Sequence, residues 1–196
     1  MSVNIKALQQ AKLIIAKKLE EFETMNSMMV TVGIHEDQNS SVGDGEMTMA
    51  RLGATLNYGA EIDHPGGTRY TKTADGKARF ISNDSTAPAM GVTGPHKIII
   101  PARPWLEPGV ASAEQDISDT FKDAFVKDLP VKQVLEQMGS LAVGAVQQYM
   151  TDLKEPPNAK STIKQKGSSN PLIDTGALRA SVTYKVTNEK PDEGIL

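Results

Sequence analysis

Three histidines, His35, His64 and His96, are the residues whose type best suits metal binding or proton transfer. Their spacing matches no short metal-binding motif such as H-E-x-x-H, and each lies beside a turn or a strand end. We therefore interpret them as surface or hydrogen-bonded histidines and not as a metal centre. The chain contains no cysteine, which excludes disulfides, thiolate zinc sites and cysteine nucleophiles.

Serine, aspartate and histidine are all present, so a small hydrolase remains an alternative. The sequence has neither a G-x-S-x-G elbow nor a glycine-rich phosphate loop. Asp174-Thr175-Gly176 is similar to the catalytic segment of aspartic proteases, but those enzymes need two facing carboxylates and the chain holds a single copy. We expect no enzymatic activity, no cofactor and no metal.

The segment 101–106, Pro-Ala-Arg-Pro-Trp-Leu, contains the only tryptophan of the chain between rigid prolines. Proline keeps its own backbone and that of the preceding residue extended. Two interpretations are open. Trp105 is either a core anchor at a corner between a strand and a helix, or the base of a rigid hook that presents Arg103 to a neighbouring subunit.

Residues 172–181, Leu-Ile-Asp-Thr-Gly-Ala-Leu-Arg-Ala-Ser, form a second segment of interest. Asp174 or Thr175 can cap a single helical turn by accepting free backbone N–H groups. Leu178 would pack inward, and Arg179 could bind a carboxylate through two hydrogen bonds.

Residues 154–171 contain two adjacent prolines and a Gly-Ser-Ser-Asn-Pro run, and they predict a long extended arm. The arm is basic, and its positive charges are Lys154, Lys160, Lys164 and Lys166. They could contact phosphate, meet an acidic protein surface or remain solvated. Lys and Arg total 21 against 24 for Asp and Glu, a net charge of −3, so we favour the second or third possibility over a nucleic-acid coat protein.

Hydrophobic periodicity predicts three longer helices, over residues 4–25, 109–128 and 131–153. Strands are expected at 28–35, 97–100 and 181–187, the second of them buried, and a short helix at 47–57 ends before Gly59. Residues 62–97 predict a β-hairpin and loop insertion, in which Asp75-Gly76 closes a hairpin between Tyr70 and Ile81.

The length of 196 residues suits one α+β domain over residues 1–196. We expect a mixed, mainly antiparallel sheet packed against the three longer helices, with the two insertions extending from it. No apolar run approaches the ~20 residues that a membrane-spanning helix needs, and no signal peptide is predicted.

Four segments resemble a known family when they are taken in order: residues 30–34 (VTVGI), 57–59 (NYG), 100–106 (IPARPWL) and 170–182 (NPLIDTGALRASV). Together they are similar to the virion morphogenesis, or tail-completion, proteins of tailed bacteriophages. The resemblance spans most of residues 28–187, and the last two segments carry its specificity. The stretch 62–97 is longer than the family pattern leads us to expect.

The resemblance implies a structural virion protein without catalytic activity, located in the neck or at the top of the tail. It implies a small α+β subunit in a ring around the DNA channel: a hexamer that matches tail symmetry or, alternatively, a twelvefold ring on the portal side. Its partners would be further copies and the neighbouring connector, tail-terminator or tail-tube proteins. Genomic DNA would pass through the lumen without sequence-specific binding, assembly would occur in the host cytoplasm, and no membrane would be involved.

Under this interpretation, Arg103 and Arg179 either make ion pairs between subunits or position the loops. Trp105, Leu172 and Leu178 anchor the two corners. The basic arm and the acidic end of the first helix are opposite in sign and far apart in sequence, which suits a head-to-tail contact that closes into a ring. The residues expected at the subunit interface or in the structural motifs are Arg103, Trp105, Leu106, Leu172, Asp174, Thr175, Leu178 and Arg179. A small DNA-binding adaptor is the other alternative.

Overall fold

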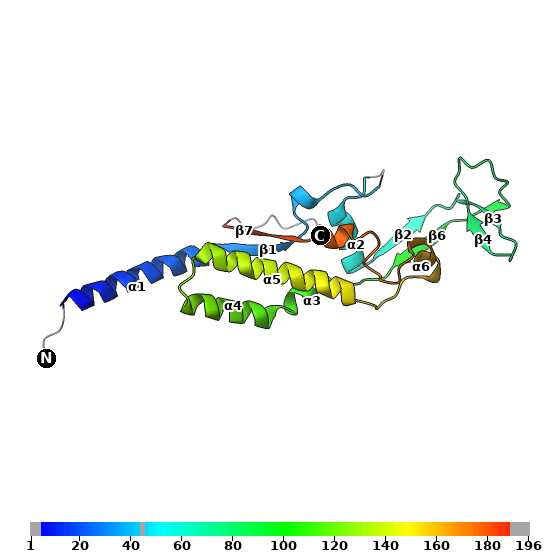
Figure 1. The fold of residues 1–196 in the computed structure, drawn as a ribbon. Coiled ribbons are helices and arrows are strands. Elements are labelled where there is room, and N and C mark those ends of the chain that lie inside the picture. The colour runs from blue at the N-terminus through cyan, green and yellow to red at the C-terminus, as the bar shows by residue number, and fades with distance from the viewer. Residues whose placement is uncertain (1–4, 44–45, 189–196) are drawn as a thin grey trace.

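Helix α5, Val131–Asp152, is the central element of the computed structural model, which describes residues 5–43 and 46–188. Its apolar stripe contributes Val134, Leu135, Ala142, Val146 and Met150 to the core. Strands β1 (Met29–Gly33) and β7 (Thr183–Thr187) cover one side of α5, and helices α3 (Leu106–Ala111) and α4 (Glu114–Val126) cover the other (Figure 1). The α+β class is confirmed.

Further elements extend the molecule on both sides of this body. They are helix α1 (Ile5–Asn26), the 3₁₀ turn η1 (Glu36–Gln38), helix α2 (Met49–Tyr58), strands β2 (Ala60–His64), β3 (Arg69–Lys72), β4 (Ala78–Phe80), β5 (Gly91–Val92) and β6 (His96–Ile100), and helices α6 (Lys160–Lys166) and α7 (Ala177–Ala180). The result is an elongated molecule with α1 at one end and the strands β2–β6 at the other (Figure 1).

The strands form three small antiparallel sheets and not the one mixed sheet that we expected. β1 pairs with β7, with Val30 opposite Val186. β2 pairs with β6 from Ala60–Ile100 to His64–His96, and β3 pairs with both β4 and β5. Each ladder has only two or three strands, and no common sheet forms among the described residues.

The insertion 62–97 projects from the body as a β arm, which we define as β2 to β6, residues 60–100. The expected hairpin is present: Tyr70 pairs with Phe80, and the Gly76 N–H donates to the Thr73 carbonyl at 2.8 Å. The prediction that 97–100 is buried is wrong. Ile99 is 72% exposed and Ile98 37%.

The base of the β arm is held by a close approach of two backbones. Gly59 follows α2 with φ +78, as the Asn-Tyr-Gly pattern predicted, and a Cβ there would lie 2.7 Å from the Ile100 carbonyl oxygen and 2.8 Å from the Ala102 nitrogen. Only glycine fits this position. Arg103 N–H then donates to the Leu56 carbonyl at 2.8 Å, so the arm leaves α2 at a defined point.

Two predicted elements differ from the structure. The expected helix 109–128 is two helices, because the Ser112 hydroxyl donates back to the Gly109 carbonyl at 2.7 Å and the chain bends at residues 112–113. The expected extended arm 154–171 contains the helix α6 and folds back onto the body. Its lysine-rich middle adopts a helix because it includes no proline or glycine between residues 158 and 166.

Candidate assembly surfaces

The corner around Trp105 lies in the hydrophobic core. Its side chain is 3% exposed, and its indole Nε1 donates to the Gly53 carbonyl at 3.0 Å. Its backbone N–H donates to the side-chain oxygen of Asn57 at 2.9 Å, and that of Leu106 reaches the same oxygen at 3.4 Å. Of the two interpretations of Trp105, the core anchor is therefore correct.

Arg103 is engaged within its own chain and does not extend toward a neighbour. It is 4% exposed; Nε donates to the Pro156 carbonyl at 2.8 Å, and Nη2 reaches the Pro157 carbonyl at 3.2 Å and the side-chain oxygen of Asn158 at 3.3 Å. Burial lowers the pKa of this guanidinium. Of the two roles open to Arg103, the geometry fits the positioning of a loop. The interpretation that a hook presents Arg103 to a neighbouring subunit is wrong, because the side chain is buried in its own chain.

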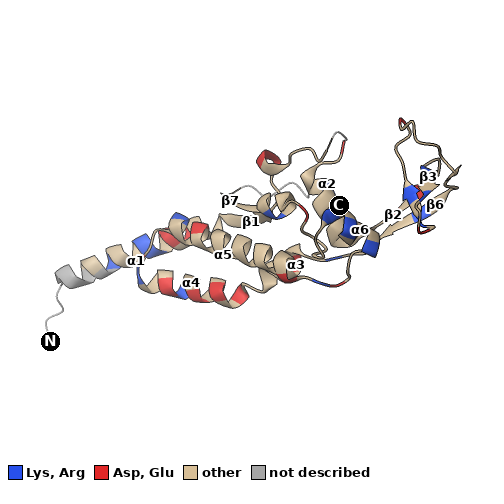
Figure 2. Ribbon diagram, turned by 45° about the vertical axis from the view of Figure 1, so that its right-hand side comes forward, with Lys and Arg blue, Asp and Glu red and all other residues tan. Residues whose placement is uncertain are grey.

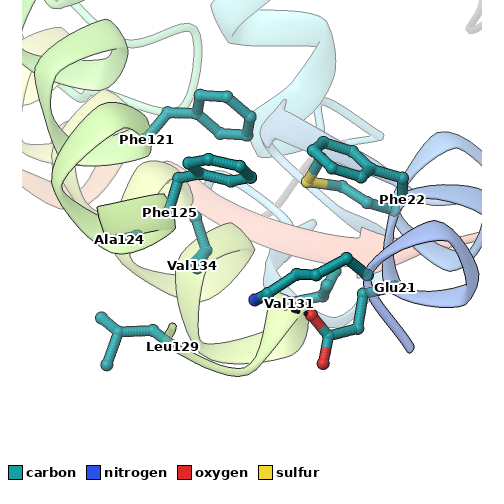
Figure 3. Close-up of a pocket in the computed structure, with 10 residues that line it drawn as sticks. Glu21, Phe22, Phe121, Ala124, Phe125, Leu129, Val131 and Val134 are labelled. Atoms are coloured by element: carbon teal, nitrogen blue, oxygen red, sulfur yellow. Dashed lines mark hydrogen bonds and ion pairs between the residues drawn. The ribbon is translucent and has the colours of Figure 1, made fainter. Parts of the chain in front are cut away.

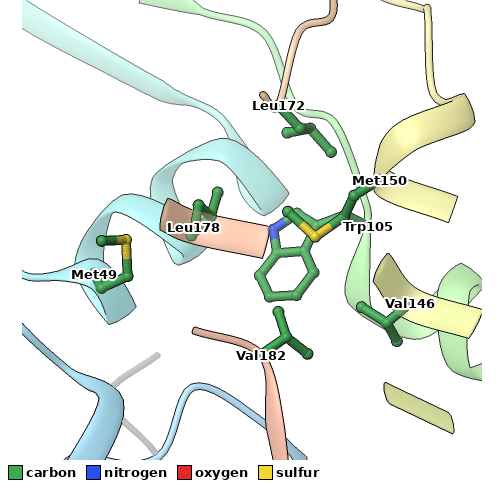
Figure 4. Packing of buried hydrophobic residues seen from close by; sticks show 7 residues of the cluster. All are labelled: Met49, Trp105, Val146, Met150, Leu172, Leu178 and Val182. Carbon is green, nitrogen blue, oxygen red and sulfur yellow. The ribbon is translucent and has the colours of Figure 1, made fainter. Parts of the chain in front are cut away.

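The second segment packs against the same corner. Leu172 and Leu178 are buried in one cluster with Trp105, Met150 and Val146 (Figure 4). The cluster is completed by Met49 and Val182. The two segments are separated by more than sixty residues in the sequence, yet their apolar side chains form one core.

The polar residues of the second segment also bond within the chain. The N-cap of the single turn α7 is Gly176, so the prediction that Asp174 or Thr175 caps it is wrong. The Thr175 hydroxyl, one residue earlier, accepts the Ala177 N–H at 3.3 Å, and Asp174 is exposed. Arg179 Nη1 donates to the Thr151 hydroxyl at 3.1 Å. The expected carboxylate partner of Arg179 is not found among the described residues.

Two of the four arm lysines bind backbone carbonyls of their own chain. Lys154 Nζ donates to the Thr151 carbonyl at 3.1 Å, and Lys166 Nζ to the Asn170 carbonyl at 3.0 Å. Burial lowers the pKa of Lys166, nearby Asp174 raises it, and Arg103 lowers it. Lys160 and Lys164 are exposed on α6.

Sequence reasoning missed two asparagines that hold these segments together. The Asn57 side chain accepts a hydrogen bond from the backbone of Trp105, and Asn170 connects α5 to the second segment. Asn170 Nδ2 donates to the Thr151 carbonyl at 2.8 Å, and its Oδ1 accepts the N–H groups of Leu172 at 2.8 Å and Ile173 at 2.9 Å. Each asparagine lies next to a residue that ends or breaks regular structure, which was the available signal.

The three histidines do not converge. His35 lies between the hydroxyls of Thr31 and Thr183, each at 2.9 Å, while His64 and His96 stack across the β2–β6 ladder with ring centroids 4.8 Å apart. Within residues 5–43 and 46–188, no group of three or more histidine or carboxylate residues is placed to hold a metal ion. Every buried side-chain nitrogen or oxygen in that part of the chain has a hydrogen-bond partner.

A small apolar pocket lies where α1 meets α4 and α5. Phe22 of α1 faces Phe121 and Phe125 of α4 across it (Figure 3), and the Phe22 and Phe125 ring centroids are 5.6 Å apart. Its charged residues, Lys18 and Glu21, are hydrogen-bonded to each other at 3.1 Å. The pocket thus joins one end of α1 to the body, and its two charged side chains are paired with each other.

Large apolar side chains are exposed at both ends of the molecule, away from the Trp105 corner. On α1, Ile14 and Ile15 are each about 60% exposed. On the β arm, Phe80 and Ile99 are 65% and 72% exposed. Isolated exposed apolar residues are ordinary, but clusters of them on two projecting elements are typical of surfaces that other molecules cover.

The charges of the projecting elements also differ from those of the body. Glu21, at the acidic end of α1, bonds to Lys17 and Lys18 of the same helix, and the hydrogen bond from Lys18 lowers the pKa of its carboxyl. Helix α4 carries acidic residues along its length (Figure 2). Glu20 and Glu23 of the α1 end remain exposed, so the acidic residues of α4 are a second acidic surface beside that end.

Comparison of the chain with protein-family models, with curated proteins and with solved structures finds no match. None of the helices in the described residues is long and apolar enough to span a membrane.

Proposed function

We propose that this chain is a structural subunit that assembles with copies of itself into a ring, in the neck or at the top of the tail of a tailed bacteriophage. The observation that carries the proposal is the elongated shape with an apolar, projecting element at each end. Exposed clusters on α1 and on the β arm remain in water in the single chain, and a neighbouring subunit can bury them.

The family resemblance of residues 100–106 and 170–182 supports the same function. Both segments lie in the core around Trp105, where they hold together α2, α5 and the base of the β arm. In this interpretation, the segments build a rigid body, and the projecting elements make the contacts. Two different surfaces on one subunit form a head-to-tail contact, which closes into a ring when the rotation per copy divides a full turn.

A DNA-binding adaptor is less well supported. Lys154 and Lys166 already donate to carbonyls of their own chain, which leaves Lys160 and Lys164 of the proposed phosphate-binding lysines exposed on α6. A binding site with so few phosphate contacts would show a shallow dependence of affinity on salt.

The test is genetic and structural. Disruption of the gene in the phage or prophage that carries it should yield filled heads and tails that fail to join, or tails of abnormal length, and plasmid expression should restore infectivity. Negative-stain images of the purified chain with connector or tail-tube protein should show rings. Infectious particles from the disrupted strain, with no copies of this chain in wild-type virions, would refute the proposal.

A further inference from the structure

We infer that the outer half of α1 docks into the groove between α3 and α4 of a second copy of this chain. The choice of a second copy as occupant rests on the proposed ring assembly; the two surfaces themselves are argued from their packing, shape and charge. The outer half of α1 is defined as residues 9–17, the part that precedes its contact with α4 and α5 at Lys18.

The inner end of α1 is fixed, and this directs the outer half away from the body. Phe22 packs against Phe125, while Lys18 forms ion pairs with Glu21 and with Asp128 at the end of α4. The helix is continuous from Ile5 to Asn26, so the residues before Lys18 project beyond α4 and α5 (Figure 1). About ten residues at 1.5 Å each extend roughly 15 Å from the contact.

The projecting part exposes the same face that packs at the inner end. Ile15, Leu19 and Phe22 recur at helical spacing, and their exposed fractions fall from 60% to 58% and 41% toward the body. Helical stability in proteins comes mainly from packing of such a face. In the described chain this face stays exposed along the projecting part, so another molecule can bury it.

The groove between α3 and α4 has the matching properties. It is lined by Leu106, Val110, Ala111 and Ile117, with Glu107 and Glu114 as its charged residues. The α3–α4 segment, residues 106–126, carries five carboxylates and one lysine, whereas residues 9–17 of α1 carry two lysines and no carboxylate. An apolar helix flanked by Lys12 and Lys17 therefore meets an apolar groove flanked by carboxylates.

The contact is heterologous, since each copy offers one helix and one groove. Every subunit can then bind a neighbour on both sides, which generates a ring or, without closure, a filament. The β arm remains available for a second contact, since neither surface includes residues 60–100.

The absence of cysteine allows a clean cross-linking test in the full-length chain. Ile15→Cys and Ala111→Cys are made as separate variants, one with a size tag, and mixed under mild oxidation. We expect a disulfide-linked heterodimer in the mixture and no comparable product from either variant alone. Ile15→Cys mixed with Leu141→Cys, on the neighbouring α4–α5 surface, or with Ile99→Cys, on the β arm, should give at least tenfold less product.

A charge-reversal pair provides the second readout. Lys12→Glu should weaken self-association roughly tenfold by light scattering, because it places like charges at the groove, and Glu114→Lys in the same chain should restore it. Circular dichroism checks that both variants fold. Lys132→Glu, on the exposed start of α5, is the matched control and should leave association unchanged.

The outcomes separate this inference from the proposed function. Coupling of Ile15→Cys with itself would place α1 against α1, and equal coupling to Leu141→Cys would place it in another groove; either result overturns the inference. Rings of wild-type protein, with no disulfide between the Ile15→Cys and Ala111→Cys variants, would also overturn it while the proposed function stands. If the two variants couple specifically but the gene is dispensable for joining phage heads to tails, the proposed interface stands and the neck function is refuted.

Discussion

The side-chain oxygen of Asn57 accepts the backbone N–H of Trp105 at 2.9 Å inside the core and joins the end of α2 to the corner that starts α3. Asn57→Ala leaves this buried donor without a partner, so we expect the free energy of unfolding to fall by about 1–3 kcal/mol. Urea denaturation followed by tryptophan fluorescence measures the change. Asn83→Ala, in an exposed loop, is the control and should change stability by no more than ~0.5 kcal/mol.

Trp105 contributes both volume and one hydrogen bond to the core. Trp105→Ala should lower the free energy of unfolding by about 3–5 kcal/mol because it opens a cavity among Val146, Met150 and Leu178. Trp105→Phe keeps much of the ring packing but loses the bond to the Gly53 carbonyl, and it should cost about 1–2 kcal/mol. Thermal melts followed by circular dichroism rank the two variants; an unchanged melting temperature for the alanine variant would contradict the anchor role.

Arg103 holds residues 156–158 against the body through three hydrogen bonds. Arg103→Ala should release the 154–171 segment, so hydrogen exchange and tryptic cleavage after Lys160 and Lys164 should become faster. Arg103→Lys keeps the charge but not the planar set of donors, and it should rescue the segment only in part. Arg51→Ala, on the exposed side of α2, is the control, and identical cleavage rates in Arg103→Ala and wild type would exclude the proposed loop-positioning role.

Two glycines of α5 should respond to alanine in opposite directions. A Cβ at Gly139 would lie 2.3 Å from Cδ2 of the Tyr184 ring, so Gly139→Ala displaces β7 and should destabilise the protein by about 1–3 kcal/mol. At Gly144 nothing lies within 4 Å, and Gly144→Ala should stabilise the same helix by about 0.5–1 kcal/mol. Denaturation midpoints of the two variants measure the changes. If both variants are less stable than wild type, helix propensity does not determine the effect of the substitution at residue 144.

His35 makes stability depend on pH. Burial lowers its pKa below the ordinary value of 6.5, the positive charge of Lys185 lowers it further, and Asp37 opposes this. The unfolded chain therefore binds the proton more readily than the folded chain, so this contribution to stability is present above pH ~6.5 and is lost as the pH falls from there toward the lower folded-state pKa. Melting temperatures between pH 7.5 and 5 should fall less steeply in His35→Gln than in wild type; parallel curves would contradict the assignment.

Several parts of the fold could be predicted because their signals are local. The apolar stripe of 131–153 specifies a helix, and Asp75-Gly76 specifies a tight turn, since both depend on neighbouring residues alone. The break at Ser112 escaped prediction because it depends on how a side chain bonds to its own backbone. The helix at 160–166 escaped it although residues 158–166 hold no proline or glycine, because the prolines and the Gly-Ser-Ser run on either side led us to expect an extended arm.

The sequence alone determined most of the longer elements, the α+β class and the identity of the anchoring residues Trp105, Leu172 and Leu178. Only the tertiary structure decided the partners of Arg103, 53 to 55 residues away along the chain, and the exposure of Ile99 on the β2–β6 ladder. The physical reason is that propensity and turn geometry act over a few residues. Burial and hydrogen-bond partners depend instead on which distant segments pack together, and the spacing of residues in the sequence does not specify that packing.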